Sequence, residues 1–166
     1  MQDIGKLRLG KLTMELIWWL ISAIVVIKVV QPLWKEFVRY DFIYELIMFI
    51  IIFITYTRYL FFIRYTFLAH AQIVKIILIF LSLPFIFYLW EVFFNYQSFL
   101  EKQMEGMIEF EIYFRSDINF VERNETLQYL STMYNFFGCS SILAVFISPF
   151  RLLVSFWRVY NKTGRV

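Results

Sequence analysis

The sequence predicts an all-α integral membrane protein: a four-helix bundle with one patterned extracytoplasmic loop. Composition is the first reason, because 61% of the 166 residues are hydrophobic and only 17% are charged, whereas a soluble domain is about 45–50% apolar and about 25% charged. The mean hydropathy is +0.66. The second reason is the recurrence of apolar segments about 20 residues long, the length that crosses roughly 30 Å of hydrocarbon as a helix. The third is the gathering of basic residues in alternate connecting segments, which is typical of multi-pass proteins.

Four segments have the length and composition of membrane spans: residues 13–33, 42–62, 73–94 and 134–157. The first follows a basic arm and lacks the small-residue cleavage site of a signal peptide, so we expect it to be retained as a helix. The third contains Pro84 and the fourth contains Pro149, and a proline inside a helix is expected to bend it. We expect residues 1–166 to form a single membrane domain.

The loop charges predict how the spans are threaded. The N-terminal arm, the segment between the second and third spans, and the C-terminal tail are each basic, whereas loop 95–133 carries seven acids against three bases. An excess of Lys and Arg marks the cytoplasmic side. Both termini are therefore expected in the cytoplasm and loop 95–133 outside it.

Aromatic residues support the predicted depths, because Trp and Tyr prefer the two membrane–water interfaces. The aromatic residues expected at the outer interface are Trp34, Tyr40, Tyr44, Trp90, Tyr96 and Tyr134. Those expected at the inner interface are Tyr59, Tyr65, Trp157 and Tyr160.

Loop 95–133 has a pattern of its own. Apolar residues alternate from Ile108 to Phe114, which favours a short strand or an extended segment; a helix lying on the membrane is the alternative. Later in the loop, a helix is expected to start near Asn124, with this Asn as its N-cap, and to continue into the fourth span. We therefore expect the loop to fold back over the bundle.

Three ionisable residues lie at a similar predicted depth in the outer leaflet: Lys28, Glu45 and Glu91. Lys28 is roughly 9 Å below Trp34, six residues at about 1.5 Å each. An isolated charge at such a depth is unfavourable, and a lysine between two glutamates would lower the cost. The sequence therefore raises the hypothesis of an intramembrane ion cluster. The alternative is that each side chain extends to the nearby interface.

A looser set lies in the inner leaflet, where Glu15 could pair with Arg58 or with Arg151. Extension of each side chain to the cytoplasmic interface is again the alternative. His70, beside the same interface, is expected to be an ordinary interfacial polar residue. Cys139 is expected to be a packing residue.

Small residues of the fourth span form a candidate helix-packing face, because they let two helix backbones approach closely. The residues of this face are Gly138, Ser140, Ser141, Ala144 and Ser148. Whether the helix packed against this face belongs to the same chain is left open by the pattern.

The sequence offers no catalytic, cofactor-binding or metal-binding residues that we can name. One cysteine and one histidine exclude a disulfide, a CxxC pair and a multi-cysteine or bis-histidine site within one chain. Phosphate-loop, GxSxG and HExxH motifs are missing, which argues against enzymatic activity. An enzyme that acts on a lipid or quinone through Glu91, His70 or the arginines is left as a further alternative without a supporting motif. The predicted function is that of an accessory or structural subunit of a larger membrane complex. The alternative is a small homo-oligomeric transporter or channel that uses Lys28, Glu45 and Glu91.

The expected partners are the lipid bilayer and other membrane subunits, and not a nucleic acid. The chain has 21 Phe and 11 Tyr, and its richness in Phe, Ile and Tyr is typical of an AT-rich genome. The expected location is the inner membrane of a bacterium.

Overall fold

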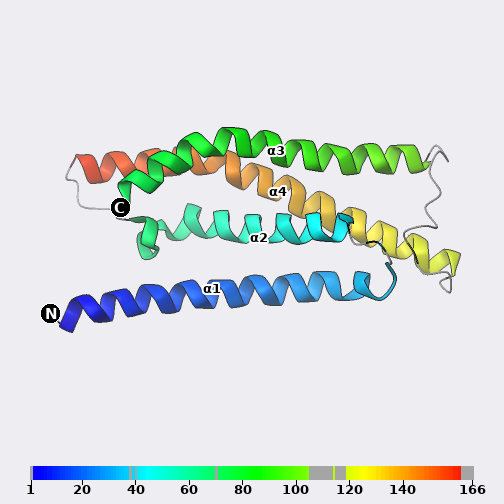
Figure 1. Cartoon of the computed structure of the whole chain (residues 1–166), viewed down its shortest axis with the longest axis horizontal. Coiled ribbons are helices and arrows are strands. Elements are labelled where there is room, and N and C mark those ends of the chain that lie inside the picture. The colour runs from blue at the N-terminus through cyan, green and yellow to red at the C-terminus, as the bar shows by residue number, and fades with distance from the viewer. Residues whose placement is uncertain are drawn as a thin grey trace.

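The computed structural model describes residues 2–37, 39, 41–69, 71–104, 114 and 119–161. These residues form four long helices: α1 (Gln2–Trp34), α2 (Asp41–Phe62), α3 (Gln72–Met104) and α4 (Phe120–Tyr160). Two short 3₁₀ turns, η1 (Ile63–Tyr65) and η2 (Phe67–Ala69), connect α2 to α3. Figure 1 shows the helices running alternately in opposite directions, so that the start of α1, the α2–α3 connection and the end of α4 lie at one end of the bundle.

Each of the four helices contains a stretch that is long and apolar enough to cross a membrane. The chain is therefore an all-α, multi-pass integral membrane protein. The helices extend beyond the predicted spans, most of all in α4, which begins at Phe120 rather than near Asn124. Asn119 is its N-cap, and the Asn119 backbone N–H donates to the Glu122 carboxylate at 3.4 Å, as in a capping box.

Helix α4 is the centre of the packing. It lies along both α2 and α3 and also touches α1, which packs mainly against α2. Figure 1 shows α1 and α3 on opposite sides, with α2 and α4 between them. Tyr134 of α4 is fully buried, and its ring stacks on that of Tyr96 with centroids 3.8 Å apart. Tyr134 and Tyr96 thus point into the core of the bundle, whereas the sequence predicted them in an outer ring of aromatic residues.

The small residues of α4 are used for packing within this chain. Gly138, Ser141, Ala144 and Ser148 are buried, and Ser140 is partly exposed. The Ser141 hydroxyl donates to the Gly138 carbonyl oxygen at 2.9 Å, so it needs no partner on a neighbouring helix. At Gly138 the aromatic ring of Phe93 from α3 comes so close that an added Cβ would lie 2.5 Å from a ring carbon. The absence of a side chain at Gly138 therefore lets α3 approach α4.

Replacing Gly138 with leucine should destabilise the bundle by about 2–3 kcal/mol, because the new side chain overpacks the contact with Phe93. Gly10→Leu is the matched control, since nothing lies within 4 Å of a Cβ built at Gly10. Equilibrium unfolding in mixed micelles measures both variants, and combination with Phe93→Ala should show a coupling of about 1 kcal/mol or more. Equal effects at Gly10 and Gly138 would contradict the close approach of α3 and α4.

At the other end of the bundle, the first connection and loop 95–133 are in contact. Phe37 and Phe114 form an antiparallel bridge, their ring centroids are 4.5 Å apart, and both residues are buried. Thr126 of α4 donates to Glu36 of the first connection. The alternating pattern predicted from Ile108 lies, except for Phe114, outside the described residues.

Candidate functional site

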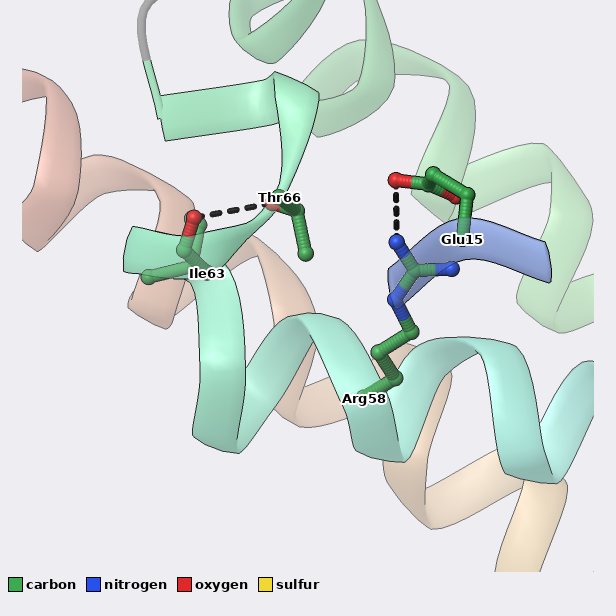
Figure 2. A network of polar contacts seen from close by, with 4 residues as sticks. All are labelled: Glu15, Arg58, Ile63 and Thr66. Atoms are coloured by element: carbon green, nitrogen blue, oxygen red, sulfur yellow. Dashed lines mark hydrogen bonds and ion pairs between the residues drawn. The ribbon is translucent and has the colours of Figure 1, made fainter. Parts of the chain in front are cut away.

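An ion pair between α1 and α2 lies near the end of the bundle that holds the α2–α3 connection. Figure 2 shows the Glu15 carboxylate facing the guanidinium of Arg58. Arg58 is only 5% exposed, and its Cζ lies 5.4 Å from the ring centroid of Tyr59, within the range of a cation–π contact. A cavity of about 30 Å³ beside the pair is lined by these residues and by Ser22, which is room for a water molecule. Of the two partners considered for Glu15, the structure therefore brings Arg58 to it.

The turn after α2 is closed beside this pair. The Thr66 hydroxyl donates to the Ile63 carbonyl oxygen at 2.8 Å (Figure 2). Thr66 is almost fully buried, so this bond satisfies a polar group that would otherwise be costly to bury. The turn directs the chain back toward the start of α3.

Lys75 is a buried cation that holds the same end of the bundle together. It is 0% exposed, and its ammonium donates to the carbonyl oxygen of Ala69 at 2.8 Å, to the hydroxyl of Ser155 at 3.0 Å and to the side-chain oxygen of Gln72 at 3.4 Å. An ammonium has three N–H donors, so each has an acceptor. Lys75 thereby joins η2, α3 and α4. In the sequence Lys75 lies just inside the third span, residues 73–94, where a lysine is expected to extend to the interface, so its burial was not predicted.

Arg151 lies beside a much larger cavity. Its Nε donates to the Leu60 carbonyl oxygen at 3.0 Å, and its side chain borders a cavity of about 370 Å³ between α2, η2, α3 and α4. The structure therefore places Arg151 against this cavity and not against Glu15.

Glu45 faces the core. The Tyr134 hydroxyl donates to its carboxylate at 2.6 Å and also lies 3.4 Å from the Val92 carbonyl oxygen. The structure thus gives Glu45 a phenol as its partner. Sequence reasoning missed this contact because Tyr134 was assigned to the interface. The one signal for an inward side chain is the spacing along α4, which puts Tyr134 on the same side of the helix as Phe137 and Ser141.

Lys28 and Glu91 face away from the bundle. Both side chains are exposed, and neither makes a hydrogen bond or ion pair with another of the described residues. Their helices, α1 and α3, lie on opposite sides of the molecule (Figure 1). The structure therefore does not join Lys28, Glu45 and Glu91 within one chain.

The remaining candidates add no chemistry to this picture. Cys139 is a free thiol exposed on α4. His70 lies outside the described residues. Within the part of the chain that the structure describes, no three His, Cys, Asp or Glu side chains are grouped so that they could hold a metal ion.

The fold and these charged groups define a class: a multi-pass membrane protein of four helices in which Arg58, Lys75 and Glu45 are held by partners within the chain. No protein family, curated protein or solved structure matches the chain.

Proposed function

We propose that this chain is a non-catalytic accessory or structural subunit of a larger membrane complex. The observation that carries the proposal is the outward exposure of Lys28 and Glu91 within two membrane-spanning helices. A charged residue within a membrane helix is unfavourable, by about 2.5–3.5 kcal/mol at the centre and by less toward the interface, and such residues nearly always face a protein interior or pair with one another. Neighbouring helices of other subunits would supply the missing partners.

Contacts of α1 and α3 with α4 relate the depths of the two residues. Val29, next to Lys28, accepts a hydrogen bond from the Tyr129 hydroxyl at 3.1 Å, and Val92, next to Glu91, lies by the Tyr134 hydroxyl. Tyr129 and Tyr134 are five residues apart on α4, which at about 1.5 Å per residue is about 7.5 Å. The two charges therefore lie within about one and a half helical turns of each other in depth.

The proposal includes an orientation and a location. Residues 1–11 at the start of α1, the α2–α3 connection and the tail after α4 are basic. The start of α1, this connection and the end of α4 lie at one end of the bundle (Figure 1). An excess of bases favours the cytoplasmic side. We place both termini in the cytoplasm and the protein in a bacterial inner membrane.

The test is gentle purification from the source membrane, with mass spectrometry of the proteins that remain bound. We expect a stoichiometric set of other membrane proteins. Lys28→Leu or Glu91→Leu should lower their recovery about tenfold or more, because tenfold corresponds to a loss of about 1.4 kcal/mol in the free energy of association. Glu125→Gln, an exposed carboxylate near the start of α4, is the control and should leave recovery unchanged.

Two other outcomes would overturn the proposal. A chain that purifies alone as a monomer has no complex to belong to. A chain that purifies as a discrete homo-oligomer, in which Lys28 of one copy meets Glu91 of the next, would favour the small transporter or channel instead.

A further inference from the structure

The large cavity at the basic end of the bundle has the dimensions of a ligand site. Its volume of about 370 Å³ falls within the roughly 300–1,000 Å³ that small-molecule sites occupy. Apolar side chains make up much of its wall, including Leu60, Leu68, Leu78 and Leu152. It is partly open at the surface of the bundle, at the level of the inner leaflet if the basic end is cytoplasmic.

One cation borders this apolar space. The Arg151 guanidinium uses its Nε on the Leu60 carbonyl oxygen, and its terminal amino groups donate to none of the described residues. None of the residues that line the cavity is acidic. The carboxylate of Glu15, the partner that the sequence also allowed for Arg151, is paired with Arg58. The positive charge of Arg151 therefore has no counter-ion within the described chain.

An apolar space with an uncompensated arginine at its wall complements a molecule with a hydrocarbon chain and an anionic group. We propose that the cavity holds one acyl chain of an anionic phospholipid, with the lipid phosphate bound by Arg151. A guanidinium binds phosphate strongly because it can donate two parallel hydrogen bonds. Basic pockets between membrane helices on the cytoplasmic side are suited to anionic head groups.

The same lining argues against a zwitterionic lipid. A choline or ethanolamine group would bring a positive charge close to Arg151, and the cavity has no acidic residue to receive it. The site should therefore select lipids by the charge of the head group as well as by the presence of an acyl chain. This proposal stands on the cavity and Arg151, and does not depend on the subunit assignment.

The experiment is native mass spectrometry of the full chain in neutral detergent, titrated with phosphatidylglycerol or phosphatidylcholine of the same acyl composition. One phosphatidylglycerol should be retained with about tenfold preference over phosphatidylcholine, and Arg151→Gln should remove that preference. Arg158→Gln, an exposed arginine on the same helix, should keep it. Glycerol phosphate at equal concentration should not displace the lipid, because it has no chain to fill the cavity.

A second variant tests the cavity itself. Leu78→Trp retains every charge but fills the space, so binding of phosphatidylglycerol should fall at least tenfold while the helical circular dichroism and the size-exclusion profile stay unchanged. Equal retention of the two lipids by the unmodified chain, unchanged preference in Arg151→Gln, or unchanged binding in Leu78→Trp would each overturn the proposal.

Discussion

Glu15→Gln is expected to lower the free energy of unfolding by about 3 kcal/mol. The substitution keeps the shape of the side chain but leaves the Arg58 guanidinium, which is 5% exposed, without a counter-charge. Removing one partner of a buried ion pair typically costs about 3–5 kcal/mol, and the lower end applies because the Glu15 side chain is 30% exposed. Equilibrium unfolding of the purified chain in mixed micelles measures the change.

The double variant Glu15→Leu with Arg58→Met separates pairing from packing. Apolar residues of similar volume in place of a buried pair are often close to neutral, so the double variant should be more stable than Glu15→Gln alone. Glu125→Gln is again the control, with a change within about 0.5 kcal/mol. A single variant as stable as the unmodified protein would mean that Arg58 does not depend on Glu15.

Lys75→Ala should also destabilise the protein by about 3 kcal/mol. The variant loses a buried four-carbon stem, comparable to a methionine-to-alanine change of about 2–5 kcal/mol, and it removes the donor to the buried oxygens of Ala69 and Ser155. Lys75→Met retains the stem, so the difference between the two variants reports the packing contribution. Unfolding in mixed micelles gives both values, and hydrogen exchange should accelerate in η1 and η2.

Ser155→Ala provides the control for this prediction, because it removes one of the three acceptors of the Lys75 ammonium and none of its stem. The expected loss is about 1 kcal/mol, that of a single hydrogen bond. If Lys75→Ala changes stability by less than Ser155→Ala, the buried ammonium does not hold α3 against α4 and η2.

Hydropathy along the chain predicts the depth of a residue but not the direction of its side chain. The four helices were predictable because each apolar stretch is long enough to span. Glu91 and Tyr96 lie on the same helix, yet Glu91 is exposed and Tyr96 is buried. A helix that is apolar on all sides has little periodicity from which its inward face can be read. Rotation about the helix axis is set by contacts such as the stacking of Tyr96 on Tyr134.

The contacts of the site could not be predicted in full, because they join residues that lie far apart in the sequence. Pairing of Glu15 with Arg58 was one of two arrangements that depth allowed, and choosing between them requires knowing that α1 packs on α2. The small residues of α4 predicted a close helix contact, but only the structure identifies Phe93 of this chain at Gly138. The start of α4 shifted because Asn119 and Glu122 together form a capping box, whereas Asn124 alone matched the simpler capping pattern.

The position of α4 in the packing has a consequence for biosynthesis. It leaves the ribosome after α1, α2 and α3, and a chain folds from its N-terminal end as it is made. Until α4 arrives, Glu45 lacks the hydroxyl of Tyr134 and Lys75 lacks that of Ser155. Until then, the first three helices are inserted in the bilayer with polar groups that lack some of their hydrogen-bond partners. During this interval a chaperone or membrane protease can distinguish the unfinished chain from the completed one.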